Sequence, residues 1–243
     1  MKALILKKQS SNEYDQLVTC YTQELGKITA IAKSIFKPTS IQAMHLDILN
    51  LVDFELVGNN HVPIITGAQA QNTYSGIKSS VKALSVAFIL AEYIEKITFD
   101  HFKDDALWNF LIGAFNRLNS NPSDPIHVLR NSQSMLIDVM GYYPNLRECV
   151  VCLSASKPGH IAFNLELGGL VCKDCFLQGS NGVLIKEDDV KMFRGISGKL
   201  HSSRSLLDVV FEHTAGKKLD SLDFFYQVNS LAGPALTGEA MVK

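Results

Sequence analysis

The four cysteines in the second half of the chain form the strongest chemical pattern in the sequence. Cys149 and Cys152 make one Cys-x-x-Cys pair, Cys172 and Cys175 make another, and residues 153–171 lie between them. Such a pair directs two thiolates at one ion, and a second pair about 15–20 residues later completes a tetrahedral shell. Soft thiolates favour Zn²⁺, with iron as the less favoured occupant. The spacing therefore predicts a structural zinc site, because the protein fills every position and leaves none for a water nucleophile.

The alternative is that these cysteines form redox pairs or idle thiols. A thioredoxin-like pair would begin a helix in a βαβ unit, and the sequence indicates no such unit here. His160 is a possible replacement ligand, although neither pair requires it. Gly168 and Gly169 precede the second pair and suit a tight approach of backbone. Cys20 lies in an apolar run and is expected to be a small core residue.

Motifs that would indicate catalysis are absent from the sequence. Gly198-Lys199 lacks the preceding glycine and the following Ser or Thr of a phosphate-binding loop. The histidines are scattered, and Asp104-Asp105 precedes a helical pattern, where carboxylates complement the helix N-terminus. A zinc-dependent hydrolase or nuclease would need an open coordination position and acid–base partners. We therefore expect that the chain is not an enzyme.

Composition limits the kind of partner that the chain can bind. Of its 243 residues, 47% are hydrophobic and 19% charged, and the formal net charge is −1. A nucleic-acid surface would therefore have to be a local patch, and lysines do outnumber carboxylates in the first forty positions. The N-terminus does not resemble a signal peptide, and no apolar run approaches the roughly 20 residues of a membrane helix. We expect a cytoplasmic protein without membrane contact, in which reduced cysteines serve as metal ligands or core residues.

The elements that must position these residues fall into two groups. Short apolar runs at residues 3–6, 17–22, 27–32, 46–57 and 62–65 are typical of strands, and Gly26 suits a hairpin turn with positive φ. Four or five short strands in about seventy residues favour a small closed barrel, because closure removes exposed sheet edges.

The apolar period then changes to that of amphipathic helices. Helices are predicted over residues 77–97, after Asp104, from Pro125 to Gly141, and over 187–200, 203–215 and 222–231. The fold class is therefore α+β and multidomain. We expect an N-terminal barrel domain at residues 1–75 and a helical domain at 76–243, with the cysteine module at about 145–180, and residues 70–76 are the best boundary.

The order of several segments resembles the RecO family of bacterial DNA-repair proteins. The segments that carry the resemblance are Leu4–Lys7, Glu13–Thr19, Leu25–Lys27, Ala32-Lys33, Pro38–Ser40, Leu51–Val57, Met140–Pro144, Cys149–Cys152 and Gly168–Cys172. They cover nearly the whole chain to about residue 215. Their order and spacing are specific, although no single segment decides the matter.

The resemblance implies an N-terminal OB-fold barrel followed by an α-helical domain with a four-cysteine zinc module. It also implies a recombination mediator that binds single- and double-stranded DNA and anneals complementary single strands. With its partner RecR, such a protein helps to load RecA on single strands covered by single-stranded-DNA-binding protein. The C-terminal tail of that binding protein would be a further partner, and the location would be the nucleoid.

The resemblance assigns DNA binding to lysines of the barrel, namely Lys7, Lys27, Lys33 and Lys37. The family often has Arg-Arg-Pro-Lys where this chain has residues 36–39, Phe-Lys-Pro-Thr, so the patch lacks two charges. Phe36 either stacks on a base or packs against the barrel, and we favour packing. Changing Lys27, Lys33 and Lys37 together to Ala is expected to lower DNA affinity and its salt dependence. The alternative function is a structural zinc-ribbon scaffold that contacts only other proteins and would not bind an oligonucleotide.

Overall fold

The computed structural model describes residues 1–37, 40–58, 62–155, 160–193 and 204–229. The chain divides into two compact units, residues 1–125 and 126–243. The first unit holds a barrel and three helices, and the second holds the remaining helices and the cysteine module. The domain limits predicted from the sequence, 1–75 and 76–243, separate the barrel strands from everything after them instead and stay a prediction.

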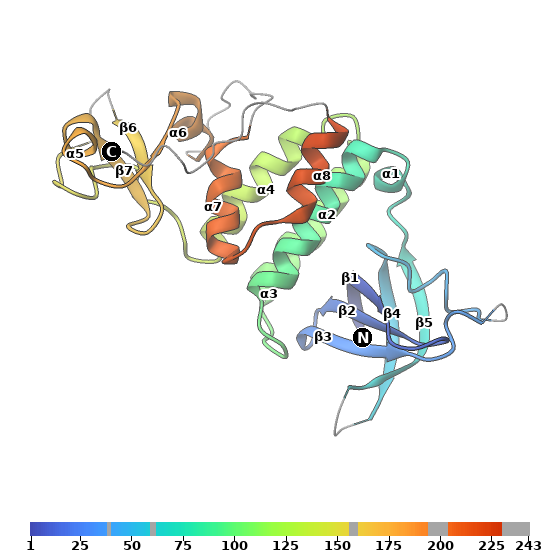
Figure 1. The fold of residues 1–243 in the computed structure, drawn as a ribbon. Coiled ribbons are helices and arrows are strands. Elements are labelled where there is room, and N and C mark those ends of the chain that lie inside the picture. The colour runs from blue at the N-terminus through green and yellow to red at the C-terminus, as the bar shows by residue number, and fades with distance from the viewer. Residues whose placement is uncertain (38–39, 59–61, 156–159, 194–203, 230–243) are drawn as a thin grey trace. The chain divides into compact units, whose positions relative to one another are not determined.

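Five strands form a closed barrel in the first unit (Figure 1). They are β1 (Lys2–Ser10), β2 (Gln16–Thr22), β3 (Gly26–Ala32), β4 (Leu51–Val57) and β5 (Ile64–Asn72). Antiparallel pairing of β1 with β4 closes the barrel, and a short parallel pairing of β3 with β5 completes the order β1-β2-β3-β5-β4. This confirms the predicted OB-fold, in which closure removes exposed sheet edges.

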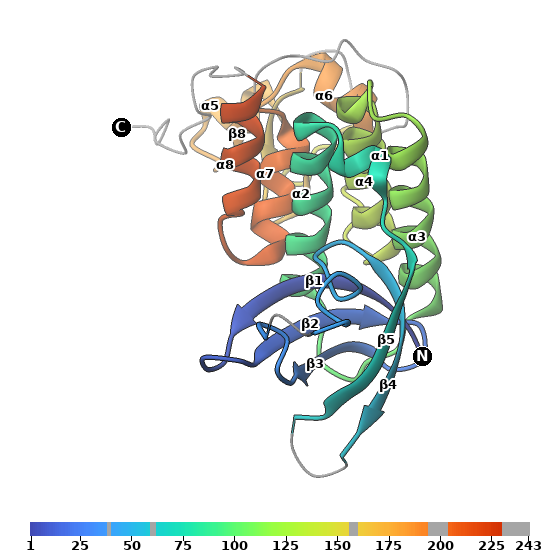
Figure 2. The same ribbon diagram turned by 90° about the vertical axis from the view of Figure 1, so that its right-hand side faces the viewer.

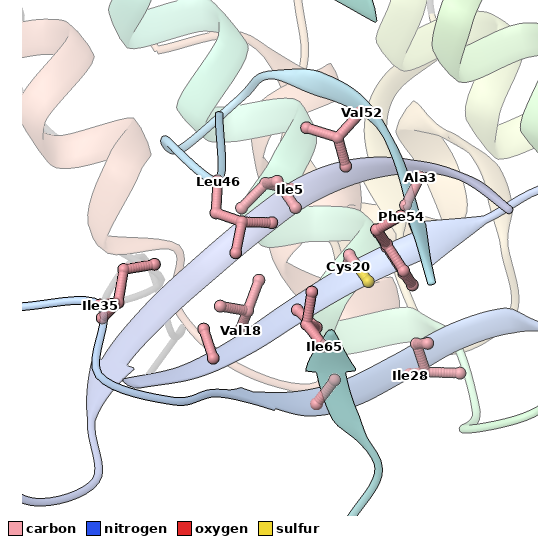
Figure 3. Close-up of a cluster of buried hydrophobic side chains, with 12 residues drawn as sticks. Ala3, Ile5, Val18, Cys20, Ile28, Ile35, Leu46, Val52, Phe54 and Ile65 are labelled. Carbon is pink, nitrogen blue, oxygen red and sulfur yellow. The ribbon is translucent and has the colours of Figure 1, made fainter. Parts of the chain in front are cut away.

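The barrel interior is filled by alternate side chains of its strands (Figure 3). Ile5, Val18, Ile28 and Phe54 are among the buried residues of this cluster, and β3 buries every second residue along its length. Cys20 lies in the same cluster without exposure, and burial raises the pKa of its thiol. The expectation that Cys20 is a core residue is confirmed.

Helices α1 (Ser75–Lys78), α2 (Val81–Ile97) and α3 (Asp105–Ser120) complete the first unit. Figure 2 shows β5 leading directly into α1. Residues 77–97 were expected to form one helix, which is wrong, because Ser80 caps a new helix by accepting a hydrogen bond from Ala83 N. The predicted cap at Asp104 is confirmed, since its side chain accepts from Leu107 N at 2.9 Å.

Helix α2 packs against β1 and β2. The loop after α2 pairs with the start of β3 through an isolated β-bridge between Asp100 and Lys27. His101 N donates to Lys27 O at 2.9 Å. Gly26 has φ +72°, as the hairpin prediction required, and a Cβ placed there would lie 2.0 Å from Phe102 O. Only glycine therefore fits at this seam, for two independent reasons.

The second unit contains α4 (Pro125–Val139), α6 (Glu187–Phe193), α7 (Leu206–Ala215) and α8 (Asp220–Val228). Pro125 begins α4 and Gly216, with φ +65°, ends α7, both as predicted. Helix α4 ends at Val139, before the predicted Gly141. The predicted ends of the helices at residues 200 and 231 lie outside the described residues.

A buried polar network joins α4, α7 and α8. Asp208 is fully buried and accepts hydrogen bonds from Gln133 Nε2 at 2.8 Å and from Arg130 and Tyr226. Burial alone would raise the pKa of Asp208, but the charge of Arg130 and these donors hold the pKa below its ordinary value. A buried carboxylate with this many donors is fully satisfied, so the network fixes the mutual register of three helices.

A small sheet and a short helix form the cysteine module. The sheet has the order β7-β6-β8, from β6 (His160–Asn164), β7 (Gly169–Cys172) and β8 (Val183–Leu184), and α5 (Lys173–Leu177) follows β7 directly.

Among the described residues of the whole chain, no helix combines the length and the apolar character needed to span a membrane.

Candidate metal centre and candidate nucleic-acid interface

Two turns of the second unit bring the four cysteines together. Cys149 and Cys152 lie in the loop after α4, Cys172 ends β7, and Cys175 lies in α5. Their sulfur atoms all lie within 4.8 Å of one another, and Cys152 Sγ is 3.8 Å from Cys172 Sγ. A tetrahedron with metal–sulfur bonds of about 2.3 Å has sulfur–sulfur edges of about 3.8 Å. The cluster that the spacing predicts is confirmed, and its size fits one metal ion.

Backbone amides stabilise negative charge on the sulfurs. Cys172 N donates to Cys149 Sγ at 3.4 Å, and Cys175 N donates to Cys172 Sγ at 3.5 Å. Hydrogen bonding to the Ser154 side chain is the largest effect that lowers the pKa of Cys152, to about 6. Hydrogen bonding to Cys172 raises the pKa of Cys175 to about 12. Four neighbouring thiols cannot all ionise without a cation, so the donor set has the chemistry of a closed metal site.

Glycines allow the two turns to approach each other. A Cβ at Gly169 would lie 2.3 Å from Val150 Cγ1 and 2.8 Å from Asn145 O, and Gly168 has φ +62°. The predicted role of this glycine pair is confirmed. His160 belongs to β6, but its side chain lies outside the described residues. Since Cys149 and Cys175 are buried and Cys152 is exposed, the module encloses the sulfur cluster from one side.

The four lysines assigned to DNA lie in two different settings on the barrel. Lys27 is the second residue of β3, and its side chain reaches the end of α2, where its Nζ donates to Glu95 O at 2.8 Å and to Thr98 O at 2.5 Å. It also lies 3.4 Å from Asp100 Oδ1, and its side chain is 15% exposed. The ammonium group of Lys27 therefore has its hydrogen-bond and ion-pair partners within the protein.

Lys7 also contacts Glu95, the residue of α2 whose carbonyl accepts from Lys27. Its Nζ lies 3.3 Å from Glu95 Oε1, and its side chain is 44% exposed. Glu95 therefore supplies a carboxylate to Lys7 and a carbonyl to Lys27. Contact of Lys7 and Lys27 with DNA stays a prediction, and it would have to compete with these internal partners.

Lys33 and Lys37 lie beyond the other end of β3, and both are exposed. Within the part of the chain that the structure describes, no carboxylate lies within 4.0 Å of either ammonium group. Lys37 Nζ lies 5.5 Å from the centre of the Tyr14 ring, in the geometry of a cation–π contact. The two lysines are thus exposed at the β1–β2 loop, where the Asp15 carboxylate is close enough for both of them to lower its pKa.

That loop contains functional candidates that the sequence reasoning missed. Asp15 was counted only as a negative charge, yet its Oδ1 accepts from Ser34 N at 2.7 Å and so holds the segment after β3. This hydrogen bond is the main reason why the pKa of Asp15 is lowered, with further lowering by Asn12, Lys33 and Lys37. The Asn12–Asp15 spacing is a known turn signature and would have been a usable signal.

Two models of a single family match successive parts of the chain. Residues 1–74 match "Recombination protein O N terminal", and residues 78–210 match "Recombination protein O C terminal". The chain belongs to the RecO family. Membership places this family member among DNA-repair proteins and agrees with the resemblance found in the sequence.

Individual relatives extend this match over most of the chain. The DNA repair protein RecO of Dehalococcoides mccartyi is 29% identical over 202 residues, which cover 83% of this chain and 79% of the relative. That of Heliobacterium modesticaldum is 30% identical over 200 residues, covering 79% and 71%. That of Roseiflexus sp. is 23% identical, and its match covers 100% of this chain and 91% of the relative.

Proposed function

We propose that this RecO-family chain is a non-catalytic recombination mediator. It binds and anneals DNA strands and, together with RecR, helps to load RecA on single strands covered by single-stranded-DNA-binding protein. The observation that carries the proposal is the exposed cluster of Lys33 and Lys37 beside the β1–β2 loop of an OB barrel. In OB-folds this loop and the face of strands 2 and 3 are the regions that bind oligonucleotides.

Charge explains why binding is placed at this cluster. With a net charge of −1, the average surface does not attract DNA. Over the described ranges of the chain, Lys33 and Lys37 are exposed, form no direct ion pair and share only the influence of the nearby Asp15 carboxylate, so they leave a local positive charge. Lys7 and Lys27 have internal partners. We therefore place the main phosphate contacts on Lys33 and Lys37, with residues 1–75 as the DNA-binding domain and 76–243 as the helical domain.

We further propose that the four cysteines bind Zn²⁺ and that the ion is structural. The protein supplies all four ligands, so the ion has no position for a reacting water. Such an ion contributes on the order of 10 kcal/mol to folding of small zinc domains. Metal analysis should give about one zinc per chain. Cys172→Ser should lose the ion and the pairing of β6 with β7, while barrel binding of DNA persists. Zinc content unchanged by Cys172→Ser would contradict the assignment.

The remaining parts of the proposal concern partners and place. RecR and the C-terminal tail of single-stranded-DNA-binding protein are the proposed protein partners, and the bacterial cytoplasm, at the nucleoid, is the proposed location. These parts rest on the RecO family alone.

Annealing of complementary oligonucleotides tests the function directly. The purified protein should accelerate annealing at low salt without cleaving or consuming either strand, and Lys33→Ala/Lys37→Ala should reduce the acceleration. A nuclease assay on the same strands serves as the control for catalysis. A folded protein that retains no oligonucleotide on a filter would contradict the proposal and favour the protein-only scaffold.

A further inference from the structure

We propose that Tyr14 and Phe36 form a base-stacking pair that makes the barrel favour single-stranded over double-stranded DNA. The inference rests on the proposed DNA-binding function and deepens it by naming the residues that select the strand type. The lysines attract any phosphate backbone, and the two rings contact only bases whose faces are accessible.

Exposure of the two rings is the first observation. Tyr14 is 46% exposed and Phe36 is 49% exposed, whereas Ile35, which directly precedes Phe36, is 5% exposed and belongs to the barrel core. Ile35 points into the barrel core (Figure 3) and therefore anchors the segment after β3. Its neighbour Phe36 stays at the surface. We expected Phe36 to pack against the barrel, but only about half of its surface is buried. The other half is accessible to a ligand.

Hydrogen bonds hold the backbone segments that carry the two rings. Phe36 N donates to Tyr14 O at 3.2 Å, and Ser34 N donates to Asp15 Oδ1 at 2.7 Å. Asn12 Oδ1 accepts from Tyr14 N at 2.9 Å and closes the turn. Because the backbone hydrogen bonds are already formed, binding a base here requires little further ordering of the protein.

The positive charge beside the rings favours a nucleic-acid ligand. Lys37 Nζ lies 5.5 Å from the Tyr14 ring centre, and Lys33 is exposed in the same segment. A single strand presents flat bases and phosphates alternately, and surfaces that bind it combine aromatic rings with cations. A duplex hides the faces of its bases in the stack, so it would reach only the lysines. A protein partner would have to match the same apolar rings within a basic setting, and it is the competing outcome of the test.

Binding of three DNA probes to Tyr14→Ala/Phe36→Ala tests the inference. The probes are a labelled oligothymidine, a strand of the same length without bases, and a duplex, each titrated at several salt concentrations. Loss of one base–aromatic stack corresponds to roughly 5- to 150-fold in affinity. We expect the double variant to lose at least about fivefold on oligothymidine and less than about twofold on the other two probes. The salt slope should stay that of the wild type, because the phosphate contacts remain.

Matched variants separate stacking from damage to the fold. Tyr14→Phe keeps the ring and should retain oligothymidine affinity, and Phe99→Ala removes an 81% exposed ring of the same unit and should change no probe. Oligothymidine affinity of the double variant within about twofold of the wild type would overturn the inference while leaving DNA binding intact. An equal loss on all three probes would overturn it as well, and a wild type that binds no probe would refute the proposed function itself.

Discussion

Lys27 and Lys33 lie at opposite ends of β3 and show how the same residue type takes two roles. Lys27 donates to two carbonyls of the α2 end, lies 3.4 Å from Asp100, and has a side chain only 15% exposed. Lys33 is exposed, and no carboxylate of the described residues lies within 4.0 Å of its ammonium group. The strand separates the two by roughly 20 Å.

The difference comes from what folds against each end of the strand. Helix α2 and the loop to Phe102 cover the Lys27 end, so a charge there is stabilised by internal acceptors. The β1–β2 loop reaches the Lys33 end and contributes an exposed ring and a carboxylate that is already occupied by Ser34 N. We infer that one end holds the first unit together and that the other is open to a ligand.

The largest effect is expected from a methyl group at the covered end. Gly26→Ala combines positive φ with a Cβ 2.0 Å from Phe102 O, and this atom belongs to the backbone and not to a flexible side chain. We expect the free energy of unfolding to fall by about 3–5 kcal/mol, measured by urea denaturation of the first unit. Gly58→Ala is the control, because it has φ +112° but its Cβ would meet nothing closer than 3.9 Å. It should lose only about 1–2 kcal/mol, and equal losses for the two variants would contradict the close packing at Gly26.

The next largest effect is the difference in stability between Lys27→Ala and Lys33→Ala. Lys27→Ala leaves the carbonyls of Glu95 and Thr98 without their charged donor, which should lower the free energy of unfolding by about 2–3 kcal/mol. Lys33→Ala should change it by less than about 0.5 kcal/mol, because its side chain is exposed. Denaturant midpoints of the two variants measure the contrast. A Lys27→Ala protein as stable as Lys33→Ala would show that the covered end is not held by this residue.

The smallest effect is a pH dependence confined to the open end. The hydrogen bond from Ser34 N, then Asn12 and the nearby lysines, lower the pKa of Asp15 below its ordinary value. A carboxyl group with a lowered folded pKa stabilises the structure above its unfolded pKa of about 3.9. The contribution is lost as pH falls through the lower, folded value. The Ser34 amide signal in an NMR titration should therefore shift in that range, and Asp15→Asn should abolish the shift. A Ser34 amide that titrates identically in Asp15→Asn would contradict this role.

Local chemistry explains which parts of the fold were predictable. The hairpin at Gly26, the cap at Asp104, the start at Pro125 and the end at Gly216 each depend on a few adjacent residues, and all four were predicted. The full length of β5 was not predicted. It was expected only at residues 62–65, because residues 66–72 are small or polar and form a strand through pairing with β4.

The candidate sites also fall into a predictable and an unpredictable group. The cysteine cluster was predicted because its spacing alone defines the chemistry of a metal site. The separate settings of Lys27 and Lys33 could not be predicted, because the partners of Lys27 are far away in sequence, at Glu95, Thr98 and Asp100. Charge counting treats the barrel lysines as equivalent, and only the packing of α2 distinguishes them.

Salt dependence of oligothymidine binding tests most directly whether the open end of β3 holds the DNA. Each phosphate contact contributes about 0.7 to the slope of log affinity against log salt on single strands. Lys33→Ala/Lys37→Ala should therefore lower the magnitude of the slope by about 1.4, while folded Lys7→Ala keeps the slope of the wild type. An unchanged slope in the double variant, or a loss of slope found with Lys7→Ala instead, would contradict the account.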